Sequence, residues 1–274
     1  MNRIENFIFM KQKNEKITML TAYDYPSGLI CASTGIDVIL VGDSSGMVVQ
    51  GKKTTIGVTI EDIIRYGQAV RKGAPESFVL VDMPYMSFHL DVQTSKKNAG
   101  RIMIETQANA VKIEGGTKNR IQTIAELIDC EIPVCGHLGL TPQSINRFGE
   151  YKVQAKSNNE QNDLLEQAIE IEKAGAFMLV LECVPEELGA TLAAKLRIPV
   201  IGIGAGRYTD GQVMVWHDIL GLSEMTPKFV KKYIDLKQII TSSVNCYVQE
   251  VKTGDFPHQN NVYYPMTKTP GTLK

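Results

Sequence analysis

Ionisable side chains end several apolar segments of this 274-residue sequence. Five segments rich in Val, Ile and Leu run directly into Asp43, Asp82, Glu114, His137 and Glu182. If these segments are parallel strands, their carboxyl ends open onto one rim, where barrel enzymes place their active sites. For any single residue, capping of loop amides is an equally good interpretation, and His137 alone is as well explained as a structural histidine. Five at one rim favour a functional site.

The acidic residues are suited to a hard cation. Two Asp and one Glu, without neighbouring His or Cys ligands, match Mg²⁺, which typically takes one or two carboxylates and accepts substrate oxygens. Such an ion, chelated by a 2-oxo acid, would polarise the carbonyl group and acidify the adjacent carbon. A carboxylate that does not bind the metal would then serve as the general base.

Strand parity gives one of these residues a partner. Side chains alternate with period two, so Lys112 and Glu114 share one face of their strand, and Val111 and Ile113 take the other. The apolar pair is expected to pack against helices, which directs Lys112 and Glu114 into the interior. Buried charges are costly unless they are paired or used, and Lys112 would offset the negative charge of a substrate.

Eight apolar segments are predicted as strands, and amphipathic stretches separate them. Most are continuous in branched residues, as strands buried on both faces are. The order predicts a single-domain (β/α)8 TIM barrel, favoured over an open doubly wound sheet because length and strand count match. The segments are 17–22, 37–43, 77–82, 110–114, 132–137, 176–182, 198–204 and 212–218.

Helix and loop signals complete this organisation. An apolar stripe from Ile121 to Ile128 predicts one helix, and Thr59 with Asp62 resembles a helix N-cap. A C-terminal helical segment is expected from Pro227 to about Val251, and residues 152–162 are interpreted as a mobile lid. We expect residues 1–252 to form the catalytic barrel and residues 253–274 a C-terminal extension on the surface or on a neighbouring subunit.

Composition excludes several classes of partner. The formal net charge of −1 and the absence of a basic stripe argue against nucleic acid and anionic membrane. The sequence has no apolar run of about 20 residues and no N-terminal signal pattern. Five cysteines without a CxxC motif suggest reduced thiols in the cytoplasm. The GIGAG segment at 202–206 lacks the third glycine of a dinucleotide fingerprint, which argues against a nicotinamide cofactor.

Several segments together closely resemble the ketopantoate hydroxymethyltransferase family. They include TAYDYP (21–26), LVGDSSGMVVQG (40–51), VKIEGG (111–116), PVCGHLGLTPQS (133–144) and LVLECVP (179–185). The resemblance spans roughly residues 17–235. It implies a (β/α)8 barrel that transfers a hydroxymethyl group from 5,10-methylenetetrahydrofolate to 3-methyl-2-oxobutanoate. The product would be 2-dehydropantoate (ketopantoate), in the first step of pantothenate biosynthesis, formed through a Mg-stabilised enolate.

The resemblance also implies roles for individual residues. Asp43 and Asp82 would bind Mg²⁺ with Glu114 in the same metal site, and Glu182 would accept the proton from C3. Ser44 and Lys112 would contact the 2-oxo acid, as would the Asp43–Asp82 pair through the metal, and His137 is a possible secondary residue. The family is typically a homo-oligomer, often a decamer. The motifs assign no folate contacts.

The sequence departs from the family pattern at three positions. Ser45 stands where Leu is usual, and Glu150 and Ala155 replace Gly around the FGEYKVQA segment. These departures leave the metal and base assignments intact and put folate affinity and loop motion in question. Two alternatives remain open: another metal-dependent barrel acting on 2-oxo acids, such as a carbon–carbon lyase or phosphoenolpyruvate mutase relative, and a non-catalytic barrel that binds a small acid.

Overall fold

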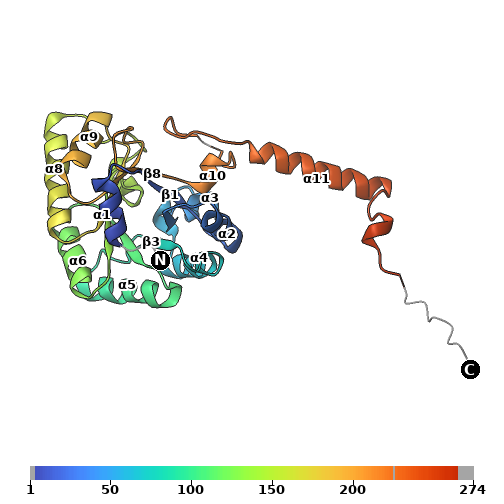
Figure 1. Ribbon diagram of the computed structural model, residues 1–274, viewed down its shortest axis with the longest axis horizontal. Coiled ribbons are helices and arrows are strands. Elements are labelled where there is room, and N and C mark those ends of the chain that lie inside the picture. The colour runs from blue at the N-terminus through green and yellow to red at the C-terminus, as the bar shows by residue number, and fades with distance from the viewer. Residues whose placement is uncertain (1–3, 225, 265–274) are drawn as a thin grey trace, which may run out of the picture.

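The computed structural model describes residues 4–224 and 226–264, and within them eight parallel strands close into a barrel in sequence order. β1 pairs with β8 as well as with β2, so the barrel, and not the open sheet, is confirmed (Figure 1). Each strand overlaps the segment predicted for it. The strands are β1 (Ile17–Thr21), β2 (Val38–Val41), β3 (Phe78–Asp82), β4 (Ala110–Glu114), β5 (Val134–Gly139), β6 (Met178–Glu182), β7 (Val200–Ile203) and β8 (Gly211–Met214).

An apolar core fills the barrel below the predicted site. Its members are inward-facing strand residues such as Leu40, Leu80 and Ala110, all buried. Phe7, from helix α1 (Ile4–Gln12), packs edge-on against Phe78 at a centroid distance of 5.0 Å. Since Phe78 is the first residue of β3, α1 covers the amino-terminal end of the barrel. The carboxyl end is therefore left for the site.

A second apolar core lies between the strands and a ring of helices. The ring runs α2 (Tyr25–Ser33), α4 (Ile60–Gly73), α5 (Val92–Thr106), α6 (Lys118–Asp129), α8 (Asn158–Lys173) and α9 (Glu186–Lys195), and consecutive members contact one another. Val111 and Ile113 belong to this outer core, as strand parity predicts. In Figure 1 these helices run around the barrel from α9 and α8 at the left, past α6 and α5, to α4 and α2 at the right.

Helix starts follow local capping chemistry. α4 begins after Thr59, whose side chain forms a capping box with Asp62, which confirms the prediction. α6 contains the predicted stripe, with Ile124 fully buried. α8 begins after Ser157, which forms a capping box with Glu160. Residues 158–162 of the segment predicted as a lid therefore belong to α8, and residues 152–156 have no regular structure.

Short elements lie between the strands and the ring helices. After β2 come α3 (Ser45–Val48) and the 3-10 turn η1 (Thr55–Gly57); after β5 come η2 (Pro142–Ser144) and α7 (Ile145–Phe148). η1 contacts η2, so the loops from β2 and β5 meet across the rim. α10 (Trp216–Ile219) follows β8, and η3 (Gln259–Asn261) lies near the C-terminus.

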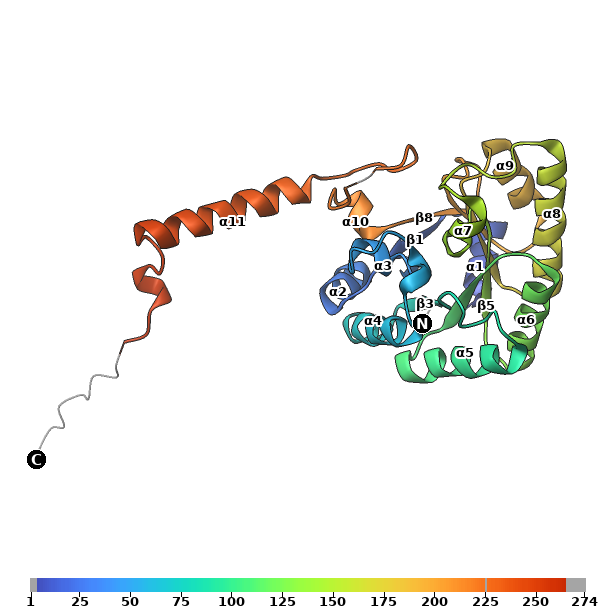
Figure 2. The same cartoon turned by 180° about the vertical axis from the view of Figure 1, so that it is seen from behind.

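The C-terminal helix α11 (Leu236–Thr253) extends away from the barrel and has no buried residue (Figure 2). Its N-cap is Asp235, whose side chain accepts a hydrogen bond from the backbone N–H of Gln238 at 3.1 Å. The prediction that this helix opens at Pro227 is thus wrong. The division at residues 252 and 253 stays a prediction, and residues 265–274 lie outside the described part. None of the helices within residues 4–224 and 226–264 is long and apolar enough to cross a membrane.

Candidate active site

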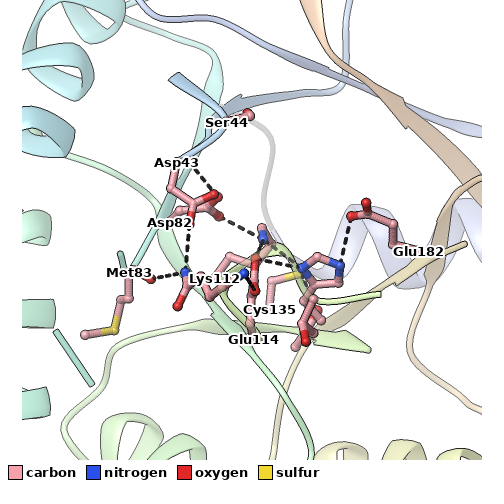
Figure 3. Close-up of polar contacts among 12 residues, drawn as sticks. Asp43, Ser44, Asp82, Met83, Lys112, Glu114, Cys135 and Glu182 are labelled. Carbon is pink, nitrogen blue, oxygen red and sulfur yellow. Dashed lines mark hydrogen bonds and ion pairs between the residues drawn. The ribbon is translucent and has the colours of Figure 1, made fainter. Parts of the chain in front are cut away.

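The predicted site residues come together at the carboxyl end of the barrel. Figure 3 shows Asp43 and Asp82 on one side, Glu182 on the other, and Lys112 and Glu114 between them. Asp82, Glu114 and Glu182 are the last residues of β3, β4 and β6, and Asp43 lies two residues after β2. The closed parallel barrel brings these strand ends together.

β4 directs two charges into the barrel. Lys112 and Glu114 are only 4% and 5% exposed, and their strand neighbours Val111 and Ile113 face the helices. The prediction from strand parity is confirmed. Barrel register aligns Lys112 with Asp82 on β3, so the two opposite charges lie side by side.

Lys112 is the central cation of the site. Its Nζ lies 3.0 Å from Oδ1 of Asp82 and 4.0 Å from Oε1 of Glu114. The same atom lies 3.1 Å from Nδ1 of His137. Burial acts to lower the pKa of Lys112, but the charges of Asp82, Glu114 and Asp43 outweigh it and raise that pKa above its usual range. Lys112 therefore remains charged.

Asp43 is hydrogen-bonded to Asp82 through its backbone and to a neutral side chain through its carboxylate. The backbone N–H of Asp43 donates to Oδ2 of Asp82 at 3.0 Å. Nε2 of Gln143 donates to Oδ2 of Asp43 at 2.8 Å and to the carbonyl oxygen of Met83 at 3.0 Å. Both partners are acceptors, so Nε2 of Gln143 must be the atom that faces them.

Gln143 also holds the third carboxylate. Its backbone N–H donates to Oε2 of Glu114 at 3.0 Å. Gln143 is 3% exposed and stands in η2, within the GLTPQS segment. One residue of the β5 loop thus fixes Asp43 and Glu114, which come from two other strands.

The two aspartates are in an environment that disfavours their charge. Burial raises the pKa of Asp43, and the charges of Glu114 and Asp82 raise it further. Burial also raises the pKa of Asp82, an effect that Lys112 only partly offsets. With Lys112 as the one fixed cation among them, three buried carboxylates leave an excess of negative charge. The site is therefore electrostatically suited to one more cation.

Glu114 and His137 form a linked pair. Nδ1 of His137 lies 3.4 Å from Oε1 of Glu114. Burial acts to raise the pKa of Glu114, but His137, the Lys112 charge and the Gln143 N–H together lower it by more. Burial and the Lys112 charge act to lower the pKa of His137, yet its bonds to Glu114 and Glu182 give a net increase.

His137 connects this pair to Glu182. Nε2 of His137 lies 3.2 Å from Oε2 of Glu182. The contact becomes an ion pair when the imidazole of His137 is protonated. The side chain of Glu182 is 16% exposed, against 3% to 5% for those of Asp82, Lys112, Glu114 and His137. Glu182 is thus oriented by His137 and accessible to a ligand.

Ser44 and a residue that the sequence interpretation missed form the other edge. Oγ of Ser44 and the hydroxyl of Tyr23 lie 2.8 Å apart, and Tyr23 is 3% exposed. Tyr23 belongs to the TAYDYP segment and Gln143 to the GLTPQS segment, and both segments carry the family resemblance. Membership of those motifs was the available signal, although neither type is ionised at neutral pH.

The sequence of the chain matches a known family. The family model described as ketopantoate hydroxymethyltransferase matches residues 2–259. The chain belongs to this family. A 3-methyl-2-oxobutanoate hydroxymethyltransferase of Bacillus subtilis (strain 168) is 50% identical over 259 residues, covering 94% of this chain and 93% of the relative. One from Clostridium beijerinckii is 44% identical over 263 residues, covering 96% and 95%.

The barrel of this ketopantoate hydroxymethyltransferase family member also resembles more distant structures. The phosphoenolpyruvate phosphomutase of Streptomyces platensis subsp. rosaceus aligns with a TM-score of 0.61 at 11% identity, covering 92% of this chain and 88% of that one. Identity at this level shows a shared fold alone. The predicted TIM barrel and family are therefore both confirmed.

Proposed function

We propose that this chain transfers a hydroxymethyl group from 5,10-methylenetetrahydrofolate to C3 of 3-methyl-2-oxobutanoate, giving 2-dehydropantoate. Family membership at 50% identity supports the reaction. The observation that carries the site assignment is the convergence of Asp43, Asp82 and Glu114 at one rim, with Glu182 linked to Glu114 through His137.

The donor set fits Mg²⁺. In the described part of the chain, no three His, Cys, Asp or Glu side chains form a ready metal cage. Mg²⁺ needs no such cage, because it is usually held by one or two carboxylates with water and substrate oxygens completing the shell. Asp43 and Asp82 would hold it, with Glu114 in the same site, and the excess negative charge favours the ion. When bound, the cation would polarise the keto group and acidify C3.

The chain's own residues orient the keto acid. Lys112 presents a buried ammonium group that offsets substrate charge as electron density moves onto the keto oxygen. Ser44 offers a hydroxyl group whose position is set by Tyr23 at 2.8 Å. Because Asp82 and Glu114 already hold Lys112, its charge is in place before the substrate arrives.

Glu182 would remove the proton from C3. Its oxygen Oε2 lies 3.2 Å from Nε2 of His137. Its side chain is also more exposed than those of Asp82, Glu114 and Lys112. In the net reaction C3 loses one hydrogen and gains CH2OH, with the methylene carbon from the folate and the oxygen from water. N5 and N10 of the folate each end with a hydrogen, one from C3 and one from water, so no oxidant or reductant is required.

Two assays of the purified protein test the proposal. With Mg²⁺ and no folate, C3 of 3-methyl-2-oxobutanoate should exchange its proton in D₂O, followed by NMR. Adding 5,10-methylenetetrahydrofolate should then yield 2-dehydropantoate. A binder without catalysis would show no exchange, and a carbon–carbon lyase or mutase would act on other 2-oxo acids without any dependence on folate.

We further propose that the protein is a homo-oligomer of the cytoplasm. Exposed apolar side chains share one face of α11: Ile239, Ile240, Val244, Tyr247 and Val251, each 46% to 56% exposed. A patch of this kind commonly marks a protein–protein interface. The five cysteines form no disulfide, which agrees with a reducing compartment. A decamer remains the expectation from the family resemblance.

A further inference from the structure

We infer that a cavity of about 580 Å³ beside the carboxylate site binds the folate co-substrate, and that Arg120 and Arg147 hold its anionic glutamate tail. The inference rests on the proposed function and adds the place of the second substrate. Glu114 and Gln143 line both this cavity and the carboxylate site, so the two share a wall. A ligand in the cavity thus lies next to a keto acid held by Asp43 and Asp82.

The size and the walls of the cavity suit a folate. Pockets for small molecules commonly measure about 300–1,000 Å³ and combine aromatic surfaces with a few polar groups. Here the walls come from the segments after β3, β4 and β5 and from one side of α8, and they include Tyr85, Phe148, Ser144 and Gln167. A pterin or aminobenzoyl ring can lie against the aromatic side chains while the polar groups contact its edges.

Arg120 brings a partly buried positive charge to this cavity without a carboxylate. Its guanidinium lies 4.9 Å from the centroid of the Phe88 ring, and Nη1 donates to the carbonyl oxygen of Phe88 at 3.4 Å. Burial lowers the pKa of Arg120. Within residues 4–224 and 226–264, the ion pairs include none between Arg120 and an acid. A desolvated guanidinium without a counter-ion favours an anionic ligand.

The other charged residues of the cavity also leave positive charge without an acidic partner. Arg147, in the last turn of α7, is exposed and likewise has no acidic partner among the described ion pairs. Glu160 is occupied with the N-cap of α8, where it accepts from the backbone N–H of Ser157 at 2.9 Å. Glu114 is held by His137 and Gln143. Asp163 is the remaining acid, and its carboxylate can accept from the amino and N–H groups of a pterin.

Kinetics of Arg120→Gln and Arg147→Gln test the assignment. Each variant should raise the KM for 5,10-methylenetetrahydrofolate about tenfold or more, the value of a charge-assisted hydrogen bond. The KM for 3-methyl-2-oxobutanoate and the folate-free C3 proton exchange should stay at wild-type values, because neither arginine belongs to the carboxylate site. Arg65→Gln, an exposed position on α4, is the matched control.

A truncated co-substrate identifies the group that the arginines bind. With the primary amide of 5,10-methylenetetrahydropteroate, which has no carboxylate, wild type and both variants should converge. Unchanged folate KM in both variants, or a penalty that persists with this amide, would overturn the inference and leave the proposed function intact. Wild-type protein that exchanges no C3 proton and transfers no carbon would instead refute the proposed function, and the inference with it. Arg147 is exposed, so its variant tests the idea even if Arg120→Gln does not fold.

Discussion

The charged side chains of this site are buried, and they tolerate burial because each has a partner. Lys112 contacts Asp82, Glu114 and His137, and His137 continues the chain of contacts to Glu182. Removing one member of such a network leaves another charge unpaired, which costs several kcal/mol in general. The network therefore couples the stability of the rim to the orientation of the proposed general base.

Glu182→Gln tests the proposed base. The amide can still contact His137 but cannot accept the C3 proton, so substrate and Mg²⁺ should bind while C3 exchange falls by about 10² to 10⁴. NMR in D₂O measures the exchange, and calorimetry measures binding. Glu187→Gln, an exposed position on α9, is the control. Exchange at the wild-type rate in Glu182→Gln would assign the proton transfer to another group.

Gln143→Ala tests the neutral side chain that donates to the Asp43 carboxylate. Without Nε2, Oδ2 of Asp43 loses the donor that lies 2.8 Å away. Loss of such a supporting hydrogen bond typically costs about 10- to 100-fold in metal affinity. Titration calorimetry with Mg²⁺ in the absence of substrate should show this weakening, and Gln68→Ala on α4 should bind as wild type does. An unchanged dissociation constant for Mg²⁺ would show that the Gln143 side chain does not support the metal site.

Sequence patterns predict site residues at the ends of strands better than site residues on loops. Asp82, Glu114 and Glu182 end apolar strands, so local hydrophobicity locates them. Tyr23 and Gln143 lie on loops after β1 and β5, where no periodic pattern directs a side chain. Gln143 meets Asp43 across 100 positions of sequence, a contact that exists only once the β5 loop folds over the rim.

At the scale of elements, the strands were predictable and two boundaries were not. Continuous branched residues identify buried parallel strands, and the closed barrel confirms all eight. The start of α11 was missed because Pro227 is a common first-turn signal, whereas Asp235 caps the helix that forms. The start of α8 at the Ser157–Glu160 capping box is hard to predict because the surrounding residues are polar and lack an apolar stripe.

Gly139→Ala tests how closely β5 and β6 approach beside the base. Gly139 has a φ of 88°, and an added Cβ would lie 2.1 Å from the carbonyl oxygen of Glu182. The variant should lose roughly 1–3 kcal/mol of unfolding free energy in urea, and C3 exchange should fall as β6 shifts. Gly100→Ala, with open space around it in α5, should instead gain about 0.5–1 kcal/mol. Equal stability of the two variants would contradict the close approach.

At the scale of the whole molecule, α11 extends away from the barrel and buries none of its residues (Figure 2). Val244 is 53% exposed within the apolar face of this helix. If that face joins copies of the chain, Val244→Asp should shift the mass measured by light scattering toward the monomer. Ser242→Asp adds the same charge on the opposite side of α11 and should leave the assembly intact. Identical masses for both variants would place the interface elsewhere.

The alternation along β4 has a consequence for how the barrel assembles. Lys112 and Glu114 alternate with Val111 and Ile113, so a pairing slip of one residue would exchange the two sets between lumen and helix layer. The slipped barrel would press an ammonium and a carboxylate into hydrocarbon and separate them from Asp82 and His137. Lys112 and Glu114 thus also destabilise the barrel in which β4 is shifted by one residue. The register that buries the apolar residues correctly is the register that places these two charges in the site.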